Sequence, residues 1–324
     1  MVKLRLNTAQ LGFILLATML AAALLPAKEH NKDVPIAWCH IQAEQTEVAR
    51  RAGGQGTFSL SLSRGTLAPV IKTRSSNGRN LALIRMTDLA TLRPMEGWVD
   101  SSQTEIISLD RFPSDEALLR QLESEYQDEF IASRVAVVRW LIRQGDSGTA
   151  LVCFIVSTTL PVARLVAFLP AQGTFIPGPS LDFPFSEMKP GIISGEVRDL
   201  LRDGNECFVT REPFRKGIAT RGVNMVIRRL ENGSFQSLWT APIEFRSLDS
   251  FPSRLQILQP PEKNIGAPST ITKGEVEFQQ SANVQAPVWK GKVEFFTAGG
   301  GKPIQSVSVT KVCAWDGSRF APLP

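Results

Sequence analysis

Histidine is nearly absent from this sequence of 324 residues, which contains only His30 and His40. Most hydrolase triads and many metal sites are built around histidine, so this scarcity leaves little room for either chemistry. The chain also has no G-x-S-x-G nucleophile elbow and no H-E-x-x-H metal motif. We therefore predict a protein that is not an enzyme and that has no catalytic residue, no bound metal and no cofactor.

Cysteine is scarce too, and none of the four residues belongs to a C-x-x-C pair. This spacing argues against a zinc site and against a thioredoxin-type redox site. In an oxidising compartment the even number permits up to two disulfides, and buried free thiols fit the sequence equally well. The pairing therefore stays open among Cys39, Cys153, Cys207 and Cys313.

Lysine and arginine form no dense run, and the formal net charge is only +5. Because nucleic-acid binding rests on clustered contacts to phosphates, we predict no nucleic-acid partner. The hydrophobic fraction of 43% and the charged fraction of 21% are typical of a globular chain.

The apolar run from Leu11 to Leu25 is shorter than the roughly 20 residues that a membrane-spanning helix needs. It follows Lys3 and Arg5 and ends at a proline and an alanine, which is the layout of a secretory signal. We expect residues 1–27 to be a signal peptide and the mature chain to be exported, to the periplasm or the extracellular space, with no membrane span. Retention of the run as an uncleaved anchor stays open.

Strand-like alternation follows a polar stretch, residues 28–56, which we predict to be a linker. Asn-Gly at 77–78, between two apolar runs, predicts a tight hairpin because both residues tolerate positive φ. With Gly-Trp-Val at 97–99 and the short apolar pair at 106–107, this stretch resembles a bacterial SH3-like domain. The resemblance implies a small barrel over residues 57–109 that binds cell-wall peptides or other envelope components.

One segment has helical periodicity. Ser114 is placed to cap a helix, and Asp115 and Glu116 complement its dipole. We predict one connecting helix within residues 110–133, packed against a neighbouring domain because an isolated helix of this length is marginal in water. Its apolar face is formed by residues at three- to four-residue spacing, Leu118, Leu119, Leu122, Tyr126 and Phe130.

Residues 134–324 repeat a strand pattern. The run Leu-Val-Cys-Phe-Ile at 151–155 is echoed by Asn-Glu-Cys-Phe-Val at 205–209, and Gly-Thr-Phe at 173–175 is echoed by Gly-Ser-Phe at 233–235. A third, weaker copy begins at Val307. This periodicity predicts a β-repeat domain of three four-stranded units.

The second repeat resembles the FG-GAP/VCBS-like repeats of extracellular β-propellers. The likeness rests on Val-Arg-Asp at 197–199, Asp-Gly-Asn-Glu at 203–206 and the apolar strand at 222–226. It implies a propeller-like stack, or an open sandwich, because three units are too few to close a normal propeller.

Acidic side chains give the only candidates for metal binding or acid catalysis. A calcium loop around Asp199, Asp203, Asn205 and Glu206 would need a further oxygen where Leu201 stands, so we predict a turn at Asp203-Gly204 that Asp199 stabilises. A glycosidase needs only two converging acids. The cluster in which such a pair could form comprises Glu187, Glu196, Asp199, Asp203 and Glu206.

Tryptophans are predicted to pack in the core, and a sugar- or peptide-binding surface would need one or two of them exposed. Those within or beside apolar strands are Trp98, Trp140, Trp239, Trp289 and Trp315.

These features predict a mostly β protein: a signal peptide, an SH3-like barrel, one linking helix and a β-repeat domain. The expected role is non-catalytic binding or scaffolding in the bacterial cell envelope, with a wall component or a protein as partner. A secreted hydrolase with paired carboxylates and a calcium-stabilised structural protein remain alternatives. The sequence does not specify the ligand or the oligomeric state.

Overall fold

Antiparallel β-strands dominate the computed structural model, which confirms the prediction of a mostly β protein. Contacts divide the chain into residues 1–34 and residues 35–324, and every element below belongs to the second part. No helix in the described part of the chain is long and apolar enough to cross a membrane. The predicted signal peptide lies outside the described residues, which are 34–50, 57–76, 78–88, 93–123, 135–145, 148–157, 162–184, 194–216, 220–247, 269–297 and 301–323.

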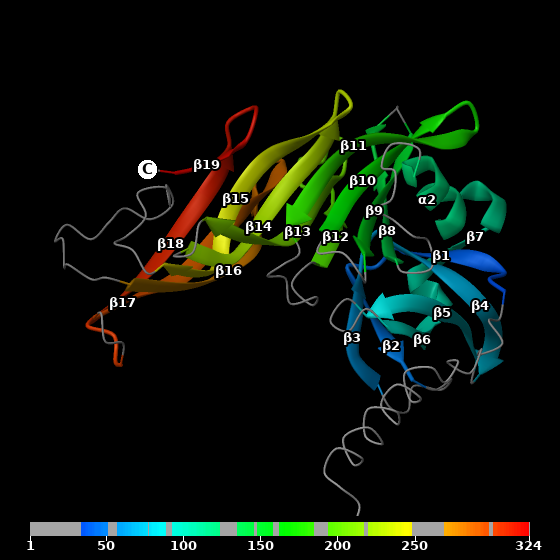
Figure 1. Ribbon diagram of the computed structural model, residues 1–324, viewed down its shortest axis with the longest axis horizontal. Helices are drawn as coiled ribbons and strands as arrows, with labels where there is room; N and C mark the ends of the chain where they lie inside the picture. Colours follow the sequence, from blue (N-terminus) through cyan, green and yellow to red (C-terminus); the bar gives the residue numbers. More distant parts are fainter. Residues whose placement is uncertain are drawn as a thin grey trace, which may run out of the picture. The chain divides into compact units, whose positions relative to one another are not determined.

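The first seven strands form the N-terminal module, in which β1 pairs with both β4 and β7 and the remaining strands follow the order β4-β5-β6-β2-β3 (Figure 1). Within the described residues β3 and β7 do not pair with each other, so these strands do not close the small barrel that was predicted over residues 57–109. Two single-turn 3₁₀ helices, η1 (Ser101–Gln103) and η2 (Leu109–Arg111), flank the last strand. The strands are β1 (Ala37–Ile41), β2 (Gln45–Ala49), β3 (Thr57–Ser63), β4 (Thr66–Ser76), β5 (Arg79–Asp88), β6 (Arg93–Asp100) and β7 (Thr104–Ile107).

The linker prediction for residues 28–56 is wrong where β1 and β2 lie. β1 buries Trp38, Cys39 and Ile41, and β2 buries Thr46 and Val48. Each strand has only five residues, and the buried positions of β1 do not alternate, so neither strand gives a clear period-two signal in the sequence. The hairpin predicted at 77–78 is confirmed: Ser76 pairs with Arg79, and Gly78 has a φ of +74°.

The connecting helix is present as α2 (Asp115–Glu123). Ser114 caps it as predicted, because its Oγ accepts a hydrogen bond from the Ala117 N–H at 3.2 Å. Leu118 and Leu119 are buried against the following strands, whereas the predicted contacts of Tyr126 and Phe130 lie outside the described residues. α2 is the only α-helix in the described ranges.

Twelve further strands form three four-stranded antiparallel units. The predicted third copy begins at Val307 and covers only the last two strands of the third unit. The first unit comprises β8 (Val135–Arg143), β9 (Thr149–Ser157), β10 (Val162–Ala171) and β11 (Thr174–Pro184). The second comprises β12 (Ser194–Arg198), β13 (Cys207–Lys216), β14 (Thr220–Glu231) and β15 (Ser234–Ser247). The third comprises β16 (Ser269–Ser281), β17 (Val284–Phe296), β18 (Gln305–Trp315) and β19 (Phe320–Pro322).

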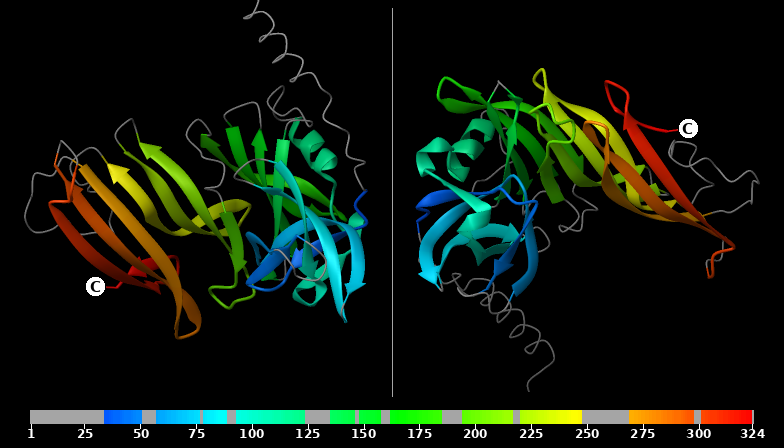
Figure 2. Two further views of the ribbon diagram at one scale, coloured as in Figure 1. Left: turned by 90° about the horizontal axis from the view of Figure 1, so that it is seen from below. Right: turned by 180° about the vertical axis from the view of Figure 1, so that it is seen from behind.

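The units are not separate sheets. Pairing of β4 with β8 joins the first unit to the N-terminal module in an 11-stranded sheet, and pairing of β15 with β16 joins the second and third units in an 8-stranded sheet. Figure 2 shows the strands of this second sheet in succession from green to red. The open stack or sandwich that the repeat implied is therefore built from two continuous sheets.

Alternating side chains bury both faces of the first two units. Along β9, Cys153 faces the core shared with α2, and Phe154 faces the core shared with the second unit. Along β13, Phe208 faces that same shared core, and Cys207 faces the core shared with the third unit. Near-continuous apolar runs such as Leu-Val-Cys-Phe-Ile are the sequence pattern expected of strands buried on both faces.

All four cysteines are buried free thiols, which decides the question that the sequence left open. Cys39 and Cys153 lie in separate cores, and only Cys207 and Cys313 share one. Burial raises the pKa of the Cys39 thiol to about 11 and the pKa of the Cys153 and Cys207 thiols to about 12. These thiols are therefore protonated and unreactive near neutral pH.

Candidate functional site

A two-residue turn between β3 and β4 connects three parts of the fold. The Gly65 C=O accepts a hydrogen bond from the Leu141 N–H of β8 at 2.8 Å, and the Arg64 C=O accepts one from the Val197 N–H of β12 at 3.1 Å. Just before the turn, the Ser63 hydroxyl donates to the Gly195 C=O at 2.6 Å. We name residues 63–65 the junction turn.

Glycine is required at the centre of this turn. Gly65 has a φ of +86°, in the region that side-chain-bearing residues rarely occupy. A Cβ at this position would lie 2.3 Å from Val197 Cγ2, so a larger residue cannot be accommodated without moving β12. The junction turn is therefore wedged between the N-terminal module and the second unit.

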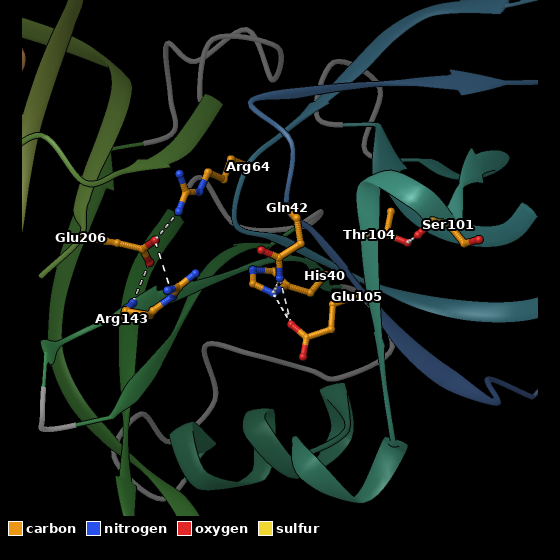
Figure 3. A network of polar contacts seen from close by, with 8 residues as sticks. All are labelled: His40, Gln42, Arg64, Ser101, Thr104, Glu105, Arg143 and Glu206. Carbon is orange, nitrogen blue, oxygen red and sulfur yellow. Dashed lines mark hydrogen bonds and ion pairs between the residues drawn. The ribbon is translucent and has the colours of Figure 1, made fainter. Parts of the chain in front are cut away.

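A buried carboxylate reinforces the same contact (Figure 3). Only 7% of the Glu206 side chain is exposed. Its Oε1 accepts from Arg64 Nη2 at 3.0 Å, and its Oε2 accepts from the Arg143 backbone N–H at 2.8 Å. Both carboxylate oxygens are thus satisfied by groups from two other elements, which offsets the cost of burying the charge.

His40 lies beside this cluster, on β1. Gln42 Nε2 is 3.0 Å from the His40 Nδ1 and donates to Glu105 Oε2 at 2.9 Å, and the ring nitrogen itself is 3.4 Å from that oxygen. Burial lowers the pKa of His40 below its usual 6.5, and the nearby Glu105 opposes that shift without cancelling it. Neither of its hydrogen-bonding contacts within the described residues is to a hydroxyl or a thiol, so His40 has no partner nucleophile there.

Glu206 and Asp203, two of the acids singled out in the sequence, have different partners. Glu206 points into the junction, whereas Asp203 accepts a hydrogen bond from the Asn205 N–H at 3.0 Å and pairs with Arg229 at 2.8 Å. The predicted turn is confirmed by the φ of +80° at Gly204. No group of three or more potential metal ligands occurs within the described residues.

Asp199 and Glu196 take different places from the ones predicted. The Asp199 Oδ1 is buried without a hydrogen-bond partner among the described residues, so this oxygen does not bond to the turn. Glu196 pairs with Arg198 at 2.7 Å. Glu187, the fifth acid of the proposed cluster, lies outside the described residues.

The cavity beside the junction turn is too small for a substrate. Its volume is about 70 Å³, against the roughly 300–1,000 Å³ typical of ligand pockets. Although Glu196 and Asp199 both line it, a sugar ring does not fit between them. The remaining lining residues are Glu44, Arg64, Val197, Arg198 and Gln285.

A larger open groove of about 460 Å³ lies on the third unit, near the point where β15 and β16 separate. Three lysines and two glutamates line it, so it offers paired positive and negative groups to a ligand. Two hydroxyl side chains, Ser308 and Thr310, also line it. The charged residues are Lys273, Lys290, Lys292, Glu244 and Glu275.

Two facing glycines form part of this groove. Gly274 pairs with Gly291, and a Cβ on either would lie within 2.3 Å of the buried Trp289 indole. The indole N–H donates to the Pro242 C=O at 2.7 Å, which holds β17 against β15. The sequence analysis missed the groove because nothing marks Gly274 as the partner of Gly291 until the register of β16 and β17 is known.

Most tryptophans are in the core, as predicted. Trp140, Trp239 and Trp289 are buried, whereas Trp98 and Trp315 are only partly so. The Lys72 Nζ lies 5.8 Å from the centre of the Trp98 ring. Trp98 is therefore the partly exposed aromatic of the N-terminal module.

Comparison of the chain with protein-family models, with curated proteins and with solved structures finds no significant match.

Proposed function

We propose that the mature chain is a non-catalytic binding or scaffolding protein of the bacterial cell envelope. The groove on the third unit carries this proposal. Its volume of about 460 Å³ lies within the range of binding sites, and it is lined by lysines, glutamates, hydroxyls and glycine backbone. Such a surface is complementary to a ligand with both amino and carboxylate groups, such as a cell-wall peptide.

The junction supports a scaffolding role. The junction turn and the buried Glu206 fix the N-terminal module to the first and second units. A ligand held by one part of the molecule would therefore be held at a set distance from the other parts. The SH3-like character of the N-terminal module and the FG-GAP/VCBS-like character of the repeats belong to the same proposal, as does export through residues 1–27.

Cosedimentation of the mature chain with purified peptidoglycan tests the proposal. We expect the wild-type chain to pellet with peptidoglycan and Lys273→Glu to lose this binding, because the substitution reverses a charge that lines the groove. Lys302→Glu is the matched control, since Lys302 is exposed and does not line the groove. Failure of the wild-type chain to pellet would contradict wall binding, and equal loss in both variants would contradict the groove as its site.

A further inference from the structure

The two edges of the 8-stranded sheet differ in what covers them. At β12 the junction turn supplies hydrogen bonds to the edge, through Val197 N–H and Gly195 C=O. At β18, β17 pairs with residues 305–312 on one side, whereas β19 pairs only with residues 313–315 on the other. Within the described part of the chain, no strand pairs with residues 305–311 on that second side.

The direction of the backbone groups at this edge follows from one hydrogen bond. The Leu323 N–H donates to the Val312 C=O at 2.8 Å, so the Val312 carbonyl points away from β17. Backbone groups alternate in direction along an antiparallel strand. Ser306, Ser308 and Thr310 therefore each present one N–H and one C=O at the edge, ready to pair with another strand.

Residues 306–310 also lack the usual features that block strand pairing. Their sequence, Ser-Val-Ser-Val-Thr, contains no proline and no charge, and three of the five residues are β-branched. By contrast β11, at one end of the 11-stranded sheet, carries Pro177 and Pro179 and a register shift next to them. Prolines at an edge remove donors that a second strand would use.

The edge sequence is nearly the same read in either direction about Ser308. Residues 304–312 read Ile-Gln-Ser-Val-Ser-Val-Thr-Lys-Val. If two copies pair antiparallel about an axis at Ser308, hydroxyl residues face hydroxyl residues and valine faces valine. Lys311 of each copy faces Gln305 of the other, so no two like charges lie directly opposite.

Exposed aliphatic side chains lie at both ends of this stretch. Ile304 is 48% exposed and Val312 is 43% exposed, and Leu323 is 50% exposed next to Val312. In the same pairing Leu323 occupies the place opposite Val312, so Ile304 of one copy reaches Leu323 of the other at each end. Association would therefore remove apolar surface from water at the positions where the monomer exposes it.

We propose that this edge of β18 is a homodimer interface, in which two copies pair antiparallel about a two-fold axis at Ser308. Residues 306–310 of each copy supply about six backbone hydrogen bonds, two for each hydrogen-bonded pair. An axis at Ser308 is the isologous arrangement that most homodimers adopt. The inference goes beyond envelope binding and does not depend on it, because association and peptidoglycan binding are measured separately.

Sedimentation velocity of the full mature chain over a concentration series tests the proposal. We expect a reversible monomer–dimer equilibrium, and Ser308→Lys should raise the dissociation constant at least about tenfold by placing two ammonium groups across the axis. Ser308→Thr is the matched control and should keep the dimer. Because Lys292 lies opposite Ser308 on β17, Ser308→Glu is a second variant, which places two carboxylates across the axis and no like charge within the monomer. It should weaken the dimer and retain the thermal melting temperature of the dilute wild-type chain.

A spin label attached to Ser308→Cys tests whether the two-fold axis passes through residue 308. The four native thiols are buried, so labelling is confined to position 308. The two α-carbons of a hydrogen-bonded antiparallel pair are about 5.5 Å apart, and strong dipolar broadening should appear as the dimer forms. A monomer at every concentration, a dimer insensitive to Ser308→Lys, or a dimer without broadening would each overturn the proposal.

Discussion

The two edges of the 8-stranded sheet differ in the hydrogen-bonding partners of their backbone groups. At β12 the backbone groups of Gly195 and Val197 are hydrogen-bonded to the junction turn, and the buried Glu206 carboxylate lies next to it. At β18 no strand within the described residues lies beside Ser306, Ser308 and Thr310 on the side away from β17. The first edge therefore contributes to folding, and the second is available for association.

The comparison shows that similar four-stranded units can have opposite roles at their outer edges. β12 is covered because Gly65 permits a turn so close to Val197 that no side chain fits between them. β18 contains no such residue, and the alternating hydroxyl residues and valines of residues 306–310 are complementary to a second copy of the same stretch. Substitutions at the two edges should therefore differ sharply in their cost to stability.

The largest effect is expected at the covered edge, for Gly65→Ala. The added Cβ would lie 2.3 Å from Val197 Cγ2, at a residue whose φ is +86°. We expect the free energy of unfolding in urea to fall by at least about 3 kcal/mol.

Gly78→Ala is the control for the backbone strain alone. Its φ is +74°, and nothing lies within 4 Å of its missing Cβ. It should cost only about 1–2 kcal/mol. Equal losses at Gly65 and Gly78 would show that the contact with Val197 does not determine the stability of this edge.

Arg64→Met should have the next largest effect. It removes the guanidinium from a Glu206 side chain that is only 7% exposed, leaving a buried charge with fewer partners. We expect a loss of about 2–4 kcal/mol in the free energy of unfolding, part of which Glu206→Gln in the same chain should restore.

Lys290→Met breaks an ion pair of the third unit for comparison. Lys290 and Glu277 are both about half exposed, and such pairs contribute less than about 1 kcal/mol. If Lys290→Met lowered the free energy of unfolding as much as Arg64→Met, burial would not explain why the Arg64–Glu206 pair contributes more than the Lys290–Glu277 pair.

Lowering the pH should decrease the free energy of unfolding through His40, which lies beside the buried Glu206. Burial lowers its pKa in the folded state, whereas the unfolded chain keeps a value near 6.5, so the unfolded state binds the proton more readily. This contribution to stability is full above pH 6.5 and is lost as the pH falls below it, by at most about 1.4 kcal/mol per pH unit.

Urea unfolding at several pH values measures this effect. In His40→Gln the free energy of unfolding should change less with pH between 6.5 and the pKa of His40 in the folded state, because glutamine does not titrate. Glu105→Gln should steepen it by removing the carboxylate that favours protonation. An unchanged profile in His40→Gln would rule out His40 as the source.

The smallest expected difference comes from deleting one hydroxyl at each edge. Ser63→Ala removes the hydrogen bond to the Gly195 C=O and should cost about 1 kcal/mol. Ser308→Ala, measured in the dilute monomer, should change the free energy of unfolding by less than about 0.5 kcal/mol because the side chain is exposed. A cost at Ser308 equal to that at Ser63 would remove the distinction between the edges.

Local signals predicted much of the fold. The Asn-Gly turn at 77–78 and the Ser114 cap both follow from residues close together in the sequence, and the structure contains each of them. β1 was missed because both of its pairing partners in the sheet are distant in sequence. For example, Trp38 pairs with Pro69 and Ile107.

The candidate sites depend on long-range contacts and were harder to predict. Glu206 looked like a member of an acidic turn, yet its side chain meets Arg64, which is far away in the sequence. Asp203 and Glu206, close neighbours in sequence, bind different arginines. Sequence proximity therefore grouped acids that the sheet geometry separates, and only the fold reveals the contact between Gly65 and Val197.

Residue-resolved amide hydrogen exchange of the mature chain, at low and high protein concentration, tests the difference between the two edges most directly. We predict that the Val197 N–H exchanges slowly at both concentrations, because it donates to the Arg64 C=O. The N–H groups of Ser306, Ser308 and Thr310 should exchange rapidly at low concentration and slowly at high concentration, as the two copies pair. Rapid exchange at Val197, or exchange at Ser308 that does not change with concentration, would contradict the assignment of a covered edge at β12 and an associating edge at β18.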